Sequence, residues 1–323
     1  MASLFCSMKI LVVLFVISAV PIGVLISLET AKPASHVYHY HSSGWLRECA
    51  KWDDLNRRFL VALFEGGVAE IRVPDEDPKP LEEVPVIREA ELAGNASLGI
   101  VIDRPRNRLM VVFADAFGNR YGALAAYDLT TWDRLFLTQL TASDVKSFAD
   151  DVAVDEEGNA YVTDAKGNKI WKVGVKGEFL STITSPLFIA KEWYKNLVGL
   201  NGIVYHPNGY LLVVHTFSGN LFKVEIGKLN EVKIIEVAGG PLSFGDGLEL
   251  FSPTKLVVAG NPSRMVESSD DWETASVVSK FKGPMHRITT AATVKDGKVY
   301  LNHILGLGYP RRKHALVEAV FSS

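Results

Sequence analysis

The chain has 323 residues, of which 48% are hydrophobic, 10% aromatic and 22% charged. This composition excludes a disordered chain and, for the body of the protein, a membrane channel. The formal net charge is −3, and the one basic cluster, residues 311–313, is short and follows Pro310. Because no basic stripe is present, we expect no nucleic-acid partner.

The N-terminus begins with a targeting segment. Lys9 precedes an apolar run over residues 10–26, which resembles a signal peptide, or a signal-anchor if it is not cleaved. The run exceeds the roughly 7 to 15 residues of a cleaved hydrophobic region, and Pro21 interrupts it at a point that would help cleavage. Cleavage would place the protein outside the cell or in a lumen, a vacuole included. Retention would anchor it to a membrane with a lumenal domain.

We divide the chain into a signal peptide or signal-anchor (1–30), a polar linker (31–44) and one folded domain (45–323). The linker carries His36, His39 and His41, which we expect to be a poor metal site without a fold to fix them. If the chain enters the secretory pathway, Asn95 becomes a glycosylation acceptor, because it begins an Asn-Ala-Ser triplet. Such a triplet also arises often by chance.

Cysteine is scarce. Cys6 lies inside the targeting segment, which leaves Cys49 alone in the folded domain and excludes an internal disulfide there. We expect Cys49 to be a small buried thiol rather than a nucleophile, because no His lies beside it in sequence.

A repeat of 45 to 52 residues organises the folded domain. Residues 150–173 align with residues 201–224 at an offset of 51 without a gap, and each copy is a meander of short apolar runs separated by Gly turns. Six copies begin near residues 48, 98, 150, 201, 246 and 289. This period predicts an all-β fold, a six-bladed β-propeller with four short antiparallel strands per blade, whose core lies between stacked blades.

Polar residues occupy the same register at the start of four copies, namely Glu48, Asp150, Asn201 and Asp246, whereas Leu98 and Thr289 stand there in the other two. In a closed ring these four side chains converge on one axial point. Carboxylate and amide oxygens suit Ca²⁺ or Mg²⁺ better than a soft metal, so the register predicts a site for a divalent cation. The alternative is that these residues cap turns by bonding local backbone amides.

The motifs around these residues resemble one family. Glu48 followed by Trp52-Asp53 is similar to the first-blade motif of the six-bladed senescence marker proteins, gluconolactonases and paraoxonases, relatives of the strictosidine synthases. The segments that begin at Asp150, Asn201 and Asp246 resemble the later ligand-bearing motifs. The resemblance implies a calcium ion that polarises the carbonyl of a small-molecule lactone or ester, with Asp246 as both metal ligand and general base.

The chain departs from this pattern in ways that limit a substrate assignment. Asp150 stands where relatives typically have Asn, and the extra charge should tighten a cation while weakening its pull on a carbonyl. The catalytic His pair of paraoxonases is replaced by Leu98 and Ala114, and no Glu occurs between Glu273 and Glu318, where strictosidine synthases use one. A paraoxonase-like mechanism and an amine–aldehyde condensation are therefore both disfavoured.

Three functions remain open. The first is a calcium-dependent hydrolase of a lactone or ester, and the second is a non-catalytic propeller that binds a small ligand, glycan or protein. The third is a membrane-anchored scaffold, which requires the N-terminal run to stay attached. Among the remaining polar residues, we expect His206 to be a solvated loop residue. The pair His286 and Arg287 either reaches the tunnel mouth or points to solvent. Trp171 and Phe222 recur at one repeat position, which predicts packing between blades.

Overall fold

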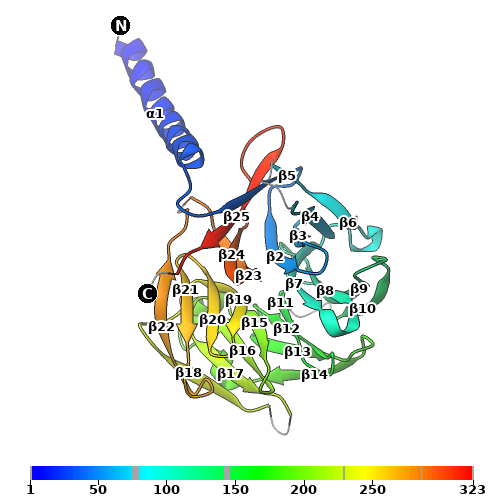
Figure 1. Ribbon diagram of the computed structural model, residues 1–323. Coiled ribbons are helices and arrows are strands. Elements are labelled where there is room, and N and C mark those ends of the chain that lie inside the picture. Colours follow the sequence, from blue (N-terminus) through cyan, green and yellow to red (C-terminus); the bar gives the residue numbers. More distant parts are fainter. Residues whose placement is uncertain (1, 75–79, 142–145, 228–229, 285, 322–323) are drawn as a thin grey trace.

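The computed structural model describes residues 2–74, 80–141, 146–227, 230–284 and 286–321. One long helix projects from a body made of small antiparallel sheets, an arrangement consistent with a β-propeller (Figure 1). Short 3-10 helices lie in the connections, at Ala90–Leu92, Arg104–Arg106, Pro186–Phe188 and Trp193–Leu197.

The sheets follow one another along the chain, each running from an inner to an outer strand. The first contains β2 (Arg47–Asp53), β3 (Arg58–Leu63), β4 (Val68–Arg72) and β6 (Val84–Ile87). Next come β7 (Ala96–Asp103), β8 (Arg108–Ala114), β9 (Gly122–Asp128) and β10 (Arg134–Gln139), then β11 (Ala149–Val154), β12 (Ala160–Asp164), β13 (Lys169–Val173) and β14 (Phe179–Thr184).

The next two groups share one sheet, because their outer strands β18 and β22 pair in parallel. They contain β15 (Leu200–His206), β16 (Tyr210–His215), β17 (Leu221–Glu225) and β18 (Val232–Ala238), followed by β19 (Gly245–Ser252), β20 (Lys255–Gly260), β21 (Ser263–Glu267) and β22 (Thr274–Phe281). The last sheet contains β23 (Thr289–Lys295), β24 (Lys298–His303), β25 (Arg312–Ala319), β1 (Val37–Ser42) and β5 (Leu81–Glu82).

The first strand of each group faces the middle of the molecule. These inner strands contact one another in the order β2, β7, β11, β15, β19 and β23, and β23 returns to β2 (Figure 1). They begin within two residues of the six positions at which the sequence repeat begins. All of them therefore begin at the same face of the ring, which we call the entry face.

An N-terminal strand completes the last sheet. β1 pairs antiparallel with β25, from Val37 opposite Val317 to Ser42 opposite Arg312. The segment expected to be a polar linker thus contains a strand. Its side chains alternate between half-buried and buried, and Tyr38 and Tyr40 lie on the buried side.

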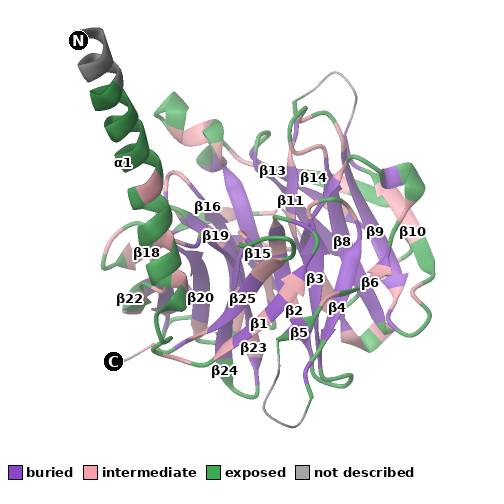
Figure 2. Ribbon diagram, turned by 90° about the horizontal axis from the view of Figure 1, so that it is seen from above, coloured by how far each residue is buried: buried purple, intermediate pink, exposed green. Residues whose placement is uncertain are grey.

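Burial explains why the middle strands lack apolar–polar alternation. Every residue of β3, β8 and β16 is buried, because each of these strands has a neighbouring sheet on both of its faces (Figure 2). The outer strands β10 and β14 are mostly exposed or half-buried. Trp171 and Phe222 are buried in the apolar clusters between sheets, as the repeat predicts.

Two features recur in the turns that follow the inner strands, a glycine with positive φ and an ion pair between Asp and Arg. Gly158 and Gly209 occupy the same turn of successive repeats with φ of 90° and 93°, a conformation that favours glycine. In the corresponding turns of the first two sheets, Arg58 bonds Asp53 at 2.9 Å (Nε to Oδ2), and Arg108 bonds Asp103 at 2.8 Å in the same way. The aligned Asp and Arg residues are therefore structural ion pairs.

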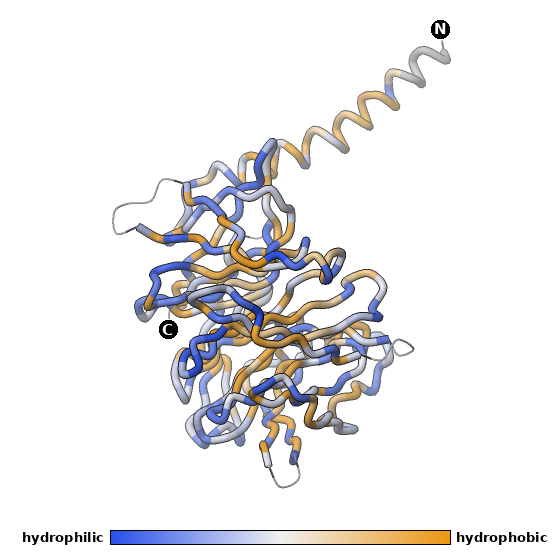
Figure 3. Tube along the Cα trace, turned by 90° about the vertical axis from the view of Figure 1, so that its right-hand side faces the viewer, coloured by the Kyte–Doolittle hydropathy of each residue, from blue (hydrophilic) through white to orange (hydrophobic). Residues whose placement is uncertain are grey.

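The helix α1 (Ala2–Thr30) stands apart from the sheets, and Figure 3 shows that its surface is mostly hydrophobic. Its segment Met8–Thr30 is long and apolar enough to cross a membrane, and its apolar window is not buried in the rest of the protein, although Glu29 in its last turn pairs with Arg287. A signal sequence has the same properties, so this finding is compatible with both N-terminal alternatives.

Candidate functional site

Four side chains singled out by the repeat line one small cavity. Glu48, Asp150, Asn201 and Asp246 come from four different inner strands, β2, β11, β15 and β19, and together they line a space of about 20 Å³. Asp150 and Asn201 are buried, at 7% and 6% exposure, whereas Glu48 and Asp246 are half-buried. The cavity lies where the inner strands begin, at the entry face.

A β-bulge sets the direction of each of these side chains. The pairing of every inner strand with its neighbour shifts by one residue at its start, for example between Arg47 and Ala50 in β2 and between Gly245 and Leu248 in β19. The same shift occurs in β7, β11, β15 and β23. In every inner strand except β23 the predicted position is the first residue inside the bulge, and bulges commonly redirect a side chain in this way.

In β23 the bulge shows that the cavity position lies one residue later than the repeat predicts. In β23 the shift lies between Thr289 and Ala291, so the residue inside it is Thr290 rather than Thr289. Thr290 lines the cavity, and its hydroxyl donates to the Glu48 carbonyl at 2.6 Å. Leu98, the corresponding residue of β7, is buried in an apolar cluster instead.

The second residue inside the bulge is small in most strands, because neighbouring inner strands approach closely there. A Cβ on Gly202 would lie 2.1 Å from the Asp246 carbonyl oxygen, and one on Gly247 would lie 2.7 Å from that of Thr290. In β11 this position is Asp151, which the sequence analysis did not select. Its carboxylate accepts the backbone N–H of Val152 at 2.9 Å.

A second layer of charged side chains lies below the four predicted side chains that line the small cavity. Lys51 and Glu249 pair at 2.6 Å (Nζ to Oε2), and the Lys51 ammonium also donates to the Ala292 carbonyl at 3.1 Å. Lys51 and Asp151 line both the small cavity and a cavity of about 300 Å³ on its inner side. Sequence reasoning missed this layer, although Lys51 and Glu249 each lie three positions after a predicted residue, at Glu48 and Asp246.

The carboxyl groups of the cavity disfavour one another's ionisation. Burial, followed by the charge of Asp151, raises the pKa of Glu48 to about 7. Burial and the charge of Glu48 raise the pKa values of Asp150 and Asp246 well above their usual range. Burial is also the main cause that raises the pKa of Asp151, to about 6. These groups share protons rather than titrating independently.

The donor set suits a hard cation, but the side chains are not drawn together around one. Three carboxylates and an amide are oxygen donors that Ca²⁺ and Mg²⁺ accept. Within the described ranges, however, no three His, Cys, Asp or Glu side chains form a group that could hold a metal ion. The Asn201 side chain instead hydrogen-bonds Asp246. Cation binding at this site therefore remains a prediction.

The remaining candidates have structural roles. Cys49 is buried at 4% exposure, and burial raises the pKa of its thiol to about 12, which makes it a poor nucleophile. His206 is not a solvated loop residue. It is 1% exposed, stacks on Tyr210 and lies 2.8 Å from the Pro253 carbonyl oxygen (Nε2 to O). Arg287 is also buried, at 2% exposure, and pairs with Glu29 of α1 rather than reaching the cavity.

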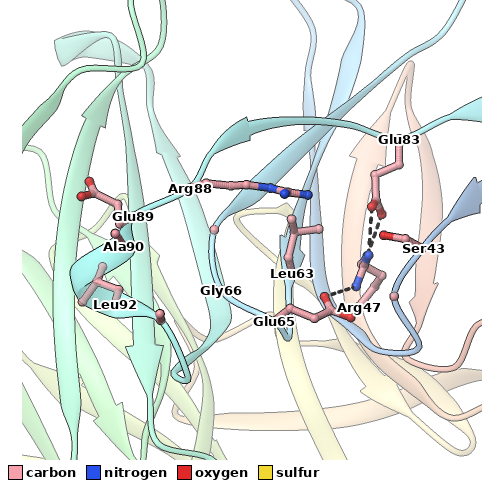
Figure 4. A pocket seen from close by; sticks show the side chains of 13 residues that line it. Ser43, Arg47, Leu63, Glu65, Gly66, Glu83, Arg88, Glu89, Ala90 and Leu92 are labelled. Carbon is pink, nitrogen blue, oxygen red and sulfur yellow. Dashed lines mark hydrogen bonds and ion pairs between the residues drawn. The ribbon is translucent and has the colours of Figure 1, made fainter.

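A larger cavity of about 520 Å³ lies beside the ring, near Arg47 and Leu63 (Figure 4). The Arg47 guanidinium projects into its wall, where it bonds Glu83 at 2.6 Å (Nε to Oε2) and Glu65 at 2.8 Å (Nη1 to Oε2). Arg47 is already held by two carboxylates. This cavity therefore has less unbalanced charge than the small cavity lined by Glu48, Asp150, Asn201 and Asp246.

Comparison with known proteins supports the fold alone. No family model and no curated protein matches the chain. It resembles the structure of virginiamycin B lyase from Staphylococcus aureus with a TM-score of 0.55 and 11% identity, over 86% of this chain and 88% of the lyase. It resembles U3-55K with a TM-score of 0.58 and 8% identity, over 89% and 100%.

A protein of unknown function from Bacteroides caccae is similar at a TM-score of 0.54 and 12% identity, over 74% of this chain and 82% of that one. At such identities the likeness establishes a β-propeller architecture and leaves activity open. The resemblance to the senescence marker protein, gluconolactonase and paraoxonase family stays a prediction.

Proposed function

We propose that this chain is a six-bladed propeller of the senescence marker protein, gluconolactonase and paraoxonase type. In this proposal the axial cavity holds a divalent cation, calcium in the first instance, and the protein hydrolyses a lactone or ester. The observation that carries the proposal is the convergence of Glu48, Asp150, Asn201 and Asp246 from four inner strands.

Charge balance in the cavity supports a cation. Its lining includes four carboxyl groups, from Glu48, Asp150, Asp151 and Asp246, and one ammonium, from Lys51. Lys51 is already paired with Glu249 in the layer below, and that carboxylate largely neutralises its charge. A dication held by the four side chains would relieve the remaining repulsion, and it would act as a Lewis acid toward a carbonyl oxygen.

Asp246 is the residue that we assign as general base. It is half-buried at the entry face, where a water molecule can reach it, and the Asn201 side chain hydrogen-bonds it and fixes its orientation. Asp150 is more deeply buried, which suits a ligand better than a group that exchanges protons with water. Thr290 holds the Glu48 backbone in place through its 2.6 Å hydrogen bond.

Calcium titration by calorimetry tests the proposal, with the full chain in detergent micelles. We expect binding in the wild type that is lost in Asp246→Asn and Glu48→Gln. It should persist in Glu65→Gln, which removes an exposed charge at the same face without touching the cavity. No binding in the wild type would make the ring a set of turn residues.

A panel of lactones and esters then separates the two remaining functions. Turnover that requires calcium and disappears in Asp246→Asn supports the hydrolase. Calcium binding without turnover would favour a non-catalytic propeller that binds a ligand or a protein.

A further inference from the structure

We propose that the entry face lies against the membrane that holds α1, and that exposed aromatic side chains of its loops insert into the lipid interface. Three observations carry this inference: the contact that fixes α1, the position of that contact, and the distribution of exposed aromatic residues. None of them depends on a metal ion or on catalysis.

The first observation is a buried contact between α1 and the propeller. Glu29, in the last turn of α1, receives two hydrogen bonds from Arg287, at 2.8 Å from Nε to Oε1 and 2.8 Å from Nη2 to Oε2. His286 also bonds Glu29 Oε1. The side chains of Arg287 and Glu29 are 2% and 18% exposed. Removing a carboxylate from a buried guanidinium is strongly unfavourable, so this pair fixes the end of a retained helix on the propeller.

The second observation is where this contact lies. His286 and Arg287 belong to the segment between β22 and β23, which reaches the entry face because β23 begins there. Figures 1 and 3 show α1 leaving the body at one edge of the ring and inclining away from the sheets. A helix that crosses a bilayer and is fixed at this point would bring the entry face close to the lipid surface.

The third observation is a ring of exposed aromatic side chains on the loops of the entry face, which we call the aromatic rim. Each comes from a different loop: Trp45 (53% exposed), Phe117 (89%), Trp193 (76%), Phe244 (62%) and Tyr309 (90%). Trp and Tyr are enriched at membrane–water interfaces, where their rings contact both lipid and water.

The opposite face provides a comparison. Its exposed aromatic residues, among those that the structure describes, are Phe179 at the start of β14 and Phe251 near the end of β19. Neither is Trp or Tyr. The bias toward the entry face is what a membrane contact predicts, whereas scattered single hydrophobic residues would need no explanation.

The charged residues of the rim loops indicate whether aromatic insertion or attraction to anionic lipid would dominate the membrane contact. Basic and acidic side chains are mixed in the rim loops, as at Lys191 and Glu192, both exposed beside Trp193. We therefore expect the contact to depend on aromatic insertion, and to change little with the content of anionic lipid.

Quenching by brominated lipid tests the proposal on the full chain in phosphatidylcholine vesicles. Cys6→Ser removes the helix cysteine, and single cysteines placed at Phe117, Trp193 or Tyr309 then carry a fluorescent label. Matched controls carry it at Leu55, Phe179 or Phe251, exposed residues of the opposite face. We expect the rim labels to lose more than about half of their fluorescence and the controls to lose almost none. Equal quenching at the two faces, or rim labels shielded only by an added protein, would overturn the proposal.

The contact at Glu29 has its own test. Glu29→Gln removes the charge but keeps the shape of the side chain, and a thermal melt confirms that the variant is folded. Rim quenching should fall at least twofold, because the propeller can then pivot about the helix end. Unchanged quenching would show that the pair with Arg287 does not orient the face.

Discussion

The Lys51 ammonium and the Glu249 carboxylate lie 2.6 Å apart, Nζ to Oε2, one layer below the ring of carboxyl groups. Their side chains are 15% and 23% exposed, so water screens the pair only in part. Burial alone would lower the pKa of Lys51, but the adjacent Glu249 carboxylate outweighs it and raises that pKa. The Lys51 ammonium therefore stays charged over the whole physiological pH range.

Removing one member of this pair should destabilise the fold. Lys51→Met leaves Glu249 partly buried without its partner, and we expect the free energy of unfolding to fall by about 2 kcal/mol. Urea denaturation measures the loss. The double variant Lys51→Met/Glu249→Leu should recover part of it, because both charges are then gone. A single variant as stable as the wild type would show that the pair contributes nothing.

The contribution of Glu48 to stability should fall between pH 6.5 and 8 when a chelator is present. The pKa of Glu48 is raised to about 7 by burial and by Asp151, above its ordinary value near 4.5. The native state therefore binds a proton that the unfolded state has lost, and its stability decreases as pH rises through 7. We expect this contribution to fall by about 1 kcal/mol, measured by urea denaturation of the wild type and of Glu48→Gln at the two pH values.

Histidine sets the limits of that pH experiment. Burial is the main cause that lowers the pKa values of His303 and His314 to about 4, so these residues favour unfolding below pH 6.5. At pH 6.5 the unfolded state still carries these imidazoles about half protonated, so their titration raises stability as the pH increases to 8 and opposes the carboxyl effect. The difference between the wild type and Glu48→Gln isolates the carboxyl effect, and equal slopes in the two proteins would assign it to other groups.

The close approach between inner strands should make Gly99 intolerant of substitution. A Cβ there would lie 2.4 Å from Asp151 Oδ1 and 2.5 Å from its Cα, so β11 would have to shift. We expect Gly99→Ala to cost about 2 kcal/mol and to weaken calcium binding. Cys49→Ala is the matched control, since it changes the equivalent position of β2 to a smaller residue. If both variants behave alike, the strand spacing is not as tight as described.

Cys49 should be unreactive in the native protein. Its thiol is 4% exposed, and burial raises its pKa to about 12, so the thiolate is scarce at pH 8. In a Cys6→Ser background, reaction with a disulfide reagent should be at least about 100-fold slower in buffer than in urea. Rapid labelling of the folded protein would reopen a role for this thiol.

The sequence allowed the prediction of four cavity residues because they recur with the repeat. Glu48 and Asp246 each occupy the first position inside a bulge, and a regular period places such positions at one end of a ring. The bulge itself was not predicted, and this is why Thr289 was expected where Thr290 lies. An extra residue inside a strand leaves no mark in composition.

Other features depend on contacts that are distant in sequence. β1 was expected to be a linker, because its His and Ser residues are polar and its pairing partner lies more than 250 residues away. His206 was expected in solvent, but it packs on Tyr210 and reaches Pro253 in the next sheet. Arg287 needs Glu29, which belongs to a different part of the chain. Local pattern carries no information about such partners.

The pairing of β1 with β25 has a consequence for the order of synthesis. Val37 and Val317 are nearly the whole domain apart in sequence, yet they lie opposite each other in one sheet. A growing chain exposes β1 early, and that strand stays without its β25 partner until β25 has left the ribosome. Until then the two ends of the ring are free sheet edges, which are prone to mispairing. Closure of the ring therefore has to wait for β25, and a chain shortened before β25 would leave the ring open.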